Sequence, residues 1–251
     1  MSEQLPNLNA LNMAAFVLDL DGVVTDTAGV HADSWKVLFD DYLREVSAKR
    51  GEPFVPFSLE GDYITYVDGR PRYEGVKAFL ESRGIELPYG TPEDPVDMET
   101  ICGLGNRKNE HFNTIIHRDG PTVFDTSADL IRHLKSKGVR TAIVSSSKNC
   151  QPVLEAAGLL DLFEVMVDGN YAATEGLPGK PAPDTFVRAC DLLGVKPEDS
   201  VAVEDAVSGV QACRAGGFKL TIGIDRGAGR EALLEAGADV VVNDLGEFDI
   251  D

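Results

Sequence analysis

The chain has 251 residues, and its 42 acidic and 23 basic side chains give a formal net charge of −19. Such a charge repels the phosphates of nucleic acids and of anionic lipids, so we expect no nucleic-acid and no membrane partner. No apolar stretch reaches the ~18 residues that a membrane-spanning helix needs. The N-terminus shows no signal peptide, and the four cysteines lie far apart without a CxxC pair, which indicates reduced thiols in a cytoplasmic protein.

The first part of the chain predicts one strand followed by helices. Residues 14–18 (AAFVL) form a short apolar run that is typical of a buried strand. Helical periodicity follows in three stretches, at residues 30–46, 75–82 and 107–116. Between them, residues 54–67 have some strand-like character, and the Pro- and acid-rich residues 87–100 predict a solvated loop.

The rest of the chain alternates between short strands and helices. Apolar runs rich in β-branched residues predict parallel strands that are covered on both faces, at residues 140–144, 164–167, 200–203, 219–224 and 239–242. Helices that each end before a glycine are predicted at residues 127–137, 151–157, 183–193 and 208–215. The acidic residues 243–251 are expected to form a solvated terminus.

These elements predict an α/β protein with a doubly wound parallel sheet. We expect two domains. Residues 1–27 and 121–251 form the α/β core, and residues 28–120 form a mainly helical domain that is inserted after the first strand.

Polar side chains gather where three of the predicted strands end. Ligands of open α/β sheets bind just beyond the carboxyl ends of the strands. The residues at these strand ends are Asp19, Asp21, Ser145, Ser146, Glu204 and Asp205. We add Lys180, which stands shortly before the helix predicted at residues 183–193. One acidic strand end can be a simple helix cap, but three polar ends at one edge indicate a binding site.

The carboxylates of this set predict transfer of a phosphoryl group with the help of a metal ion. Several carboxylates in one pocket repel one another unless a cation neutralises them, and Mg²⁺ prefers such oxygen ligands. A carboxylate beside Mg²⁺ can attack phosphorus, and a second one two residues on can donate a proton and later take one up. Lys180 and Ser145 can hold the transferring group, with Ser146 as an alternative to Ser145.

The same residues lie in four motifs that resemble those of the haloacid dehalogenase-like superfamily. The motifs are DLDGVVTD (residues 19–26), Ser145, GKPAPDTF with Lys180, and VEDAVSGVQA with Glu204 and Asp205. Their order and context agree over the whole predicted core.

The resemblance implies a Rossmann-like core, with a small helical cap domain in the place of the insertion. It implies Asp19 as the nucleophile and Asp21 as the general acid and base. It also implies Mg²⁺ ligands at Asp19, at the Asp21 carbonyl and at Asp205, with Glu204 in support. Because dehalogenase members lack the second aspartate of the first motif, Asp21 indicates phosphoryl chemistry.

Within the superfamily, the chain is similar to the β-phosphoglucomutase-like subfamily. The shared stretches are DTAGVHADSWK (residues 26–36), RKNEHF (residues 107–112) and SSSKN (residues 145–149), and they place Thr27, His31, Trp35 and Lys108 on subfamily positions. In the mutases, the histidine that matches His31 couples cap closure to Asp21, and the lysine that matches Lys108 reaches into the site from the cap.

One position departs from the subfamily pattern. Mutases carry a cap arginine shortly after a Gly-Val pair, where it grips the second phosphate of the substrate. When that pair is matched to residues 75–76, Ala78 stands in the place of the arginine. A guanidinium binds phosphate well because it offers two parallel hydrogen bonds. We take Arg72 as the replacement, with Arg70 and Lys77 as alternatives.

Three functions are open on this basis. The resemblance favours a Mg²⁺-dependent mutase that interconverts β-glucose 1-phosphate and glucose 6-phosphate through an aspartyl-phosphate. The first alternative is a phosphatase that hydrolyses a small sugar phosphate, and the second is a non-catalytic ligand-binding protein of the same fold. We expect a small sugar phosphate as the substrate and a monomer or weak dimer.

Overall fold

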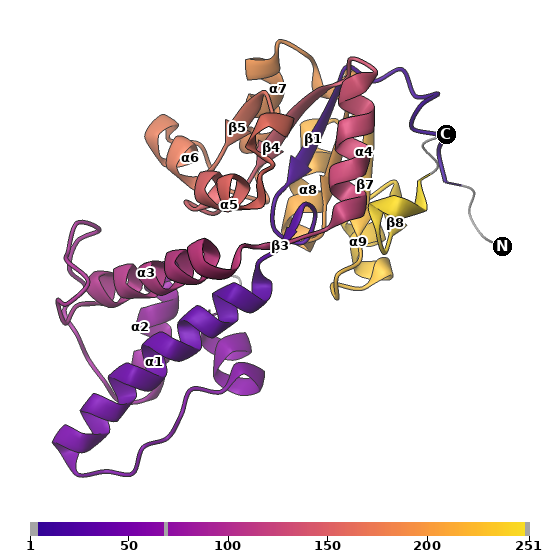
Figure 1. The fold of residues 1–251 in the computed structure, drawn as a ribbon. Coiled ribbons are helices and arrows are strands. Elements are labelled where there is room, and N and C mark those ends of the chain that lie inside the picture. The colour runs from indigo at the N-terminus through magenta and orange to yellow at the C-terminus, as the bar shows by residue number, and fades with distance from the viewer. Residues whose placement is uncertain (1–4, 68–69, 249–251) are drawn as a thin grey trace. The chain divides into compact units, whose positions relative to one another are not determined.

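The computed structural model describes residues 5–67 and 70–248, which form two compact units. The core unit contains the described residues up to Thr27 and those from Gly120 onward, and the inserted unit runs from Ala28 to Asp119. Figure 1 shows the sheet of the core unit and the helices of the inserted unit. The expectation that the N-terminus carries no signal peptide falls partly on residues 1–4, and the predicted acidic terminus includes residues 249–251; both lie outside the described residues.

A six-stranded parallel sheet forms the core unit, with the strand order β5-β4-β1-β6-β7-β8. Each of the six predicted strands is present, and its ends agree with the prediction to within one residue. Their bounds are β1 Ala15–Asp19, β4 Arg140–Val144, β5 Val165–Val167, β6 Ser200–Glu204, β7 Leu220–Ile224 and β8 Val240–Val242.

The central strand, β1, lies between β4 and β6. Its last residue, Asp19, is level with Val144 of β4, and the residue before Asp19 is level with Val203 of β6. Ser145 follows Val144 and Glu204 follows Val203 in the sequence. The parallel register therefore brings Asp19, Ser145 and Glu204 to one edge of the sheet.

Helices cover both faces of this sheet. On one face, α7 and α8 pack against each other, and their Phe186 and Ala212 meet Ala15 and Val17 of β1 in a buried cluster. Successive strand side chains point to opposite faces, so Phe16 points to the other face, where α4 crosses the sheet (Figure 1). This arrangement confirms the predicted doubly wound sheet. The helices are α4 Asp125–Ser136, α5 Cys150–Ala157, α6 Gly169–Glu175, α7 Asp184–Leu193, α8 Val207–Gly216 and α9 Arg230–Ala236.

Several short elements of the core unit are not predicted by the sequence patterns. They are α6, α9, the 3₁₀ turns Leu160–Leu162, Pro197–Asp199 and Leu245–Glu247, and an antiparallel ribbon of β2 Thr25–Asp26 and β3 Thr122–Val123. Such elements span too few residues to show a periodic pattern.

Two predictions at the ends of elements are wrong. The helix predicted over residues 208–215 does not end before Gly216, because α8 includes this residue and Gly217, at φ 72°, adopts the left-handed conformation that terminates it. The acidic terminus is not wholly solvated either. The side chains of Leu245 and Phe248 are buried, since both pack into the core unit.

The inserted unit is helical, as its periodicity predicts. It consists of α1 Ala28–Arg50, a π-helix η1 Leu59–Val67, α2 Arg72–Ser82 and α3 Ile101–Asp119. The strand-like character of residues 54–67 is misleading, because η1 occupies most of this stretch. Its aromatic and β-branched side chains serve helix packing around Phe39 and Phe79, whose rings lie 4.2 Å apart. Residues 87–100 form the predicted loop, without helix or strand.

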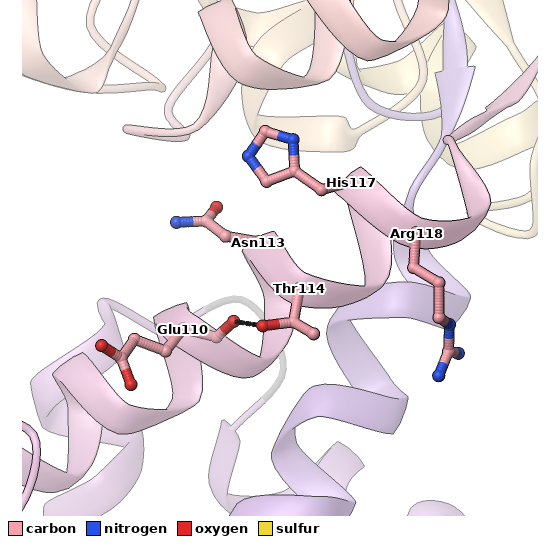
Figure 2. A pocket seen from close by; sticks show the side chains of 5 residues that line it. All are labelled: Glu110, Asn113, Thr114, His117 and Arg118. Atoms are coloured by element: carbon pink, nitrogen blue, oxygen red, sulfur yellow. Dashed lines mark hydrogen bonds between the residues drawn. The ribbon is translucent and has the colours of Figure 1, made fainter.

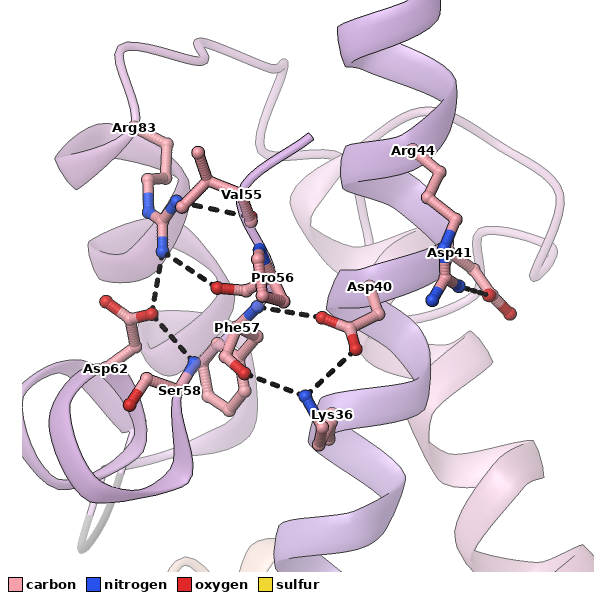
Figure 3. Close-up of polar contacts among 10 residues, drawn as sticks. All are labelled: Lys36, Asp40, Asp41, Arg44, Val55, Pro56, Phe57, Ser58, Asp62 and Arg83. Carbon is pink, nitrogen blue, oxygen red and sulfur yellow. Dashed lines mark hydrogen bonds and ion pairs between the residues drawn. The ribbon is translucent and has the colours of Figure 1, made fainter. Parts of the chain in front are cut away.

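A buried carboxylate anchors the loop that precedes η1. Asp40 of α1 accepts a hydrogen bond from the Phe57 N–H at 2.7 Å, and Lys36 Nζ lies 3.0 Å from its other oxygen and 2.9 Å from the Phe57 carbonyl (Figure 3). On the other side of the loop, Arg83, which directly follows α2, pairs with Asp62 of η1 at 2.7 Å. These contacts fix an otherwise irregular segment between two helices.

Candidate active site

Three side chains meet at the carboxyl edge of the sheet. Asp19 ends β1, Glu204 ends β6, and the Lys180 amine contacts a carboxylate oxygen of each. All three are nearly inaccessible to solvent, with 7, 1 and 11% of their side chains exposed. Buried charges persist only when they are paired and hydrogen-bonded, and this ion-pair triad meets that condition.

Burial and neighbouring carboxylates disfavour the ionised forms of the acidic groups at this edge. Burial raises the pKa of Asp19 well above its ordinary value, although the Lys180 charge acts against this rise. Burial and the Glu204 charge raise the pKa of Asp205 to about 7. For Lys180, burial acts to lower the pKa, but the two carboxylates outweigh it and the pKa rises. The pocket therefore holds a charged lysine and favours a further cation.

A divalent metal fits the carboxylates at this edge. Asp19, Glu204 and Asp205 each offer an oxygen within 4.8 Å of the other two. Two glycines make room for them. A Cβ on Gly22 (φ 80°) would lie 2.0 Å from Asp205 Oδ2, and a Cβ on Gly209 would lie 1.8 Å from Glu204 Oε1. The backbone thus approaches both carboxylates more closely than any side chain would permit.

The second aspartate of the first motif stands beside this cluster. The hydroxyl of Thr27, which is fully buried, donates a hydrogen bond to the Asp21 carboxylate. Asp21 is close enough to raise the pKa of Asp19 and of Asp205 through its charge. It is partly exposed, so it can exchange a proton with a ligand at the edge of the sheet.

The two predicted serines differ in their surroundings. Ser145 is buried, and its Oγ accepts a hydrogen bond from the Ser147 N–H at 3.0 Å. Ser146 is exposed. The N–H of Ser145 already donates to the Val167 carbonyl. The Ser145 hydroxyl is therefore the group that can donate a hydrogen bond to a phosphate.

The predicted residues of the inserted unit form a second cluster. Lys108 Nζ lies 2.7 Å from His31 Nδ1 and 5.3 and 4.9 Å from the ring centres of Trp35 and Phe112. Arg72 Nη2 donates to Oδ1 of the Asn109 side chain at 2.9 Å. Its charge also contributes, after burial and Lys108, to a His31 pKa lowered to about 3. His31, Lys108 and Arg72 therefore share one positively charged region of this unit.

A glycine pair that the sequence leaves without a function is explained by packing. A Cβ on Gly105 would lie 2.6 Å from the Tyr73 ring, and one on Gly103 would lie 2.3 Å from the Met98 carbonyl. The two glycines let α3 approach α2 and the preceding loop. Tyr73 and Arg72 are thereby held next to Asn106 and Asn109, with a Tyr73–Asn106 hydrogen bond of 2.9 Å.

A hollow on the surface of α3 lies apart from these clusters. It measures about 670 Å³ and is lined by Glu110, Asn113, Thr114, His117 and Arg118. Figure 2 shows the Thr114 hydroxyl donating to the Glu110 carbonyl and the Arg118 side chain pointing away from His117. None of the predicted site residues lines the hollow, so its size is no evidence that the reaction takes place there.

Comparison with known proteins identifies the family. A sequence model of the haloacid dehalogenase-like hydrolases matches residues 13–217. A β-phosphoglucomutase of Mycobacterium bovis is 49% identical over 238 residues, which are 93% of this chain and 90% of that protein. The chain belongs to the haloacid dehalogenase-like hydrolases. It is similar to the β-phosphoglucomutases among them, and is an enzyme of the phosphotransferase or phosphatase type.

Two further proteins are similar to the chain over nearly their whole length. A phosphorylated carbohydrates phosphatase of Thermotoga maritima is 27% identical and aligns over 92% of this chain and 94% of its own. The crystal structure of a family hydrolase from Deinococcus radiodurans R1, with bound phosphate and sodium, is 28% identical, with a TM-score of 0.67 and coverage of 94 and 93%. Family members generally use a divalent metal ion, and the three-carboxylate cluster is a candidate site for one. None of the described helices combines the length and apolar character that a bilayer span requires.

Proposed function

We propose that this enzyme transfers the phosphoryl group of a sugar phosphate through Asp19, as a Mg²⁺-dependent β-phosphoglucomutase. The observation that carries the proposal is the contact of Lys180 with both Asp19 and Glu204, beside the carboxylate cluster. The mutase relative at 49% identity supports β-glucose 1-phosphate as the substrate. A binding protein would not need a buried nucleophile and lysine next to a proton donor.

The reaction begins with attack of an Asp19 oxygen on the substrate phosphorus. The bond between phosphorus and the sugar oxygen breaks, and Asp21 gives that oxygen a proton. The phosphoryl group then sits on Asp19 as an acyl phosphate. In the second half, a sugar hydroxyl attacks phosphorus, Asp21 takes its proton, and Asp19 leaves as a carboxylate.

The other residues of the core unit position and neutralise these groups. The Thr27 hydroxyl holds the Asp21 carboxylate in place. The Lys180 ammonium offsets charge on Asp19 and on the phosphoryl oxygens, and Ser145, with Ser146 as the exposed alternative, donates a hydrogen bond to them.

A magnesium ion would be held by Asp19, Asp205 and the Asp21 carbonyl, with Glu204 in support. When bound, it supplies positive charge that offsets the repulsion between the phosphate and the carboxylates. The raised pKa values of Asp19 and Asp205 fit this role, because both carboxylates gain from a neighbouring cation.

Residues 28–120 act as a cap for the sugar end of the substrate. In the inserted unit, His31, Trp35 and Lys108 are in contact, and Arg72 lies in the same positive region. We assign the second phosphate of the sugar to Arg72, because Ala78 cannot bind it and a guanidinium offers bidentate hydrogen bonds.

A phosphatase is the second candidate, and the Thermotoga maritima relative favours it. The two activities use the same residues of the core unit. They differ in the acceptor, because a phosphatase admits water to the acyl phosphate and a mutase admits a sugar hydroxyl and excludes water.

One reaction with two readouts distinguishes them. The protein is given Mg²⁺, β-glucose 1-phosphate and a trace of glucose 1,6-bisphosphate, and glucose 6-phosphate and free phosphate are measured together. We expect glucose 6-phosphate without free phosphate. Free phosphate alone would establish the phosphatase instead, and neither product would refute this sugar as the substrate.

The Arg72→Ala variant in the same assay tests the assignment of the second phosphate. We expect its KM for the sugar phosphate to rise, with hydrolysis of a small aryl phosphate unchanged, because an aryl phosphate carries no second phosphate. Equal losses on both substrates would contradict the assignment.

A further inference from the structure

The loop that follows Asp21 is held by two other segments of the core unit. Each of its three consecutive carbonyls accepts a hydrogen bond from a residue far away in the sequence. The pairs are Gly22 with Arg226 Nε (2.9 Å), Val23 with Ser127 Oγ (2.6 Å) and Val24 with the Phe124 N–H (3.0 Å). Phe124 directly precedes α4 and Ser127 lies in its first turn, whereas Arg226 comes from the loop after β7.

Arg226 makes several contacts at once. Besides the Gly22 carbonyl, it donates from Nη1 to the Asn243 carbonyl at 2.9 Å and from Nη2 to the Asp244 carboxylate at 3.4 Å. Its guanidinium carbon lies 3.7 Å from the centre of the Phe124 ring. A planar cation with several donors is the side chain that can stack and bond in this way, which a lysine cannot do equally well.

The acidic partner of Arg226 is itself held in place. Burial would raise the pKa of Asp244, but hydrogen bonds from the Thr126 hydroxyl, the Gly246 N–H and Arg226 outweigh it and lower the pKa. Asp244 is therefore ionised at neutral pH and orients the guanidinium. The Arg226 side chain is only 24% exposed, so this pair is shielded more than a surface salt bridge.

The hydrogen bond from Arg226 is made to Gly22, the residue that lies against the Asp205 carboxylate. Gly22 lies so close to Asp205 that a Cβ on it would be 2.0 Å from Asp205 Oδ2. A shift of the Gly22 carbonyl would therefore move the surface against which Asp205 rests. The same shift would also move Asp21, which precedes Gly22.

We propose that Arg226 is a positioning residue that holds the Gly22 carbonyl and thereby sets the geometry and metal affinity of the Asp205 site. The effect on turnover rests on the proposed function, but the effect on the metal does not. Groups that orient metal ligands typically change metal affinity or activity by about 10- to 100-fold when they are removed.

The test compares Arg226→Met with Arg226→Lys and with a matched control, Arg132→Met. Arg132 is an exposed residue of α4 that pairs with Asp129 at 2.9 Å, so its loss removes a positive charge and a surface ion pair. For each protein, the dissociation constant of Mg²⁺ alone is measured by titration calorimetry. The kcat and KM for the sugar phosphate and the urea unfolding curve are measured alongside.

We expect Arg226→Met to weaken Mg²⁺ binding by about 10- to 100-fold and to lower kcat, with little change in KM. Arg226→Lys keeps one donor and should fall in between, and free guanidinium ion should partly restore Arg226→Met. A variant that unfolds more easily but binds Mg²⁺ like the wild type would overturn the proposal. If Arg226→Met does not fold, the test uses Arg226→Lys, in which stacking on the Phe124 ring is weakened. Mg²⁺ binding by Arg226→Lys with wild-type affinity would then overturn the proposal. Mg²⁺ binding without any phosphoryl transfer by the wild type would instead refute the proposed function alone.

Discussion

The imidazole of His31 lies among positive charges in the inserted unit. Its Nδ1 is 2.7 Å from Lys108 Nζ, and the Phe112 ring stacks on it at 4.3 Å. Burial, Lys108 and Arg72 lower its pKa to about 3. The ring is therefore neutral at physiological pH, and Nδ1 accepts a hydrogen bond from the lysine ammonium.

This lowered pKa predicts a pH dependence of stability. Above the ordinary pKa of 6.5, neither the folded nor the unfolded chain protonates His31, so its contribution is constant. As the pH falls from 6.5 towards 3, the unfolded chain binds a proton that the folded chain does not, and the free energy of unfolding falls. We expect His31→Gln to lack this slope and an NMR titration to show a ring pKa below about 4. A ring pKa near 6 would contradict the prediction.

That the proposed reactive side chains lie together could be predicted from the sequence, but their packing could not. Asp19, Lys180 and Glu204 follow from strand ends and motif spacing, because parallel strands end at one edge. Gly209 is needed because the Glu204 carboxylate lies against it in the folded chain. The spacing of residues along the sequence does not reveal that contact. The same holds for Arg226, whose partners are scattered over the chain.

At the scale of the elements, the loop before η1 depends on one buried carboxylate. Both oxygens of Asp40 are used, one by the Phe57 N–H and one by Lys36. Next to it, Asp41 is 58% exposed and pairs with Arg44 at the surface. Figure 3 shows the two aspartates on the same helix, with only Asp40 directed to the loop.

The two neighbours offer a matched pair of variants. In Asp40→Asn, one of the two oxygens becomes an NH₂ group that faces a donor, either the Phe57 N–H or Lys36, and the negative charge is lost. We therefore expect this variant to lower the free energy of unfolding by about 1–3 kcal/mol. Asp41→Asn removes only a surface pair, worth about 0–1 kcal/mol. Urea unfolding and hydrogen exchange of the Phe57 amide measure both. Equal effects of the two variants would show that the anchor adds nothing.

Elements differed in how far the sequence could predict them. The buried strands, such as residues 140–144, are mostly apolar and rich in β-branched residues, and they appear to within one residue. The π-helix at residues 59–67 could not be predicted, because its aromatic residues pack tertiary neighbours and imitate a strand pattern. The burial of Phe248 depends on a fold that brings the end of the chain back to α4.

In the whole molecule, the proposed reaction draws on groups of both units. The core unit holds the proposed nucleophile Asp19, with Lys180 and the carboxylate cluster, and the inserted unit holds a positive region around Lys108. A chain with a net charge of −19 repels a sugar phosphate in general, so local cations have to attract it. In the proposed function, Lys180, a divalent ion when bound and the Lys108 region supply that attraction.

In the proposed reaction, Asp19 carries the phosphoryl group. The most direct test is to mix the enzyme with Mg²⁺ and glucose 1,6-bisphosphate, quench with acid, reduce with borohydride and map the peptides by mass spectrometry. Borohydride converts an aspartyl-phosphate to homoserine, so we predict homoserine at position 19 and none in Asp19→Asn, which should also lack turnover. Homoserine at another aspartate, or turnover by the wild type without any at position 19, would contradict the account.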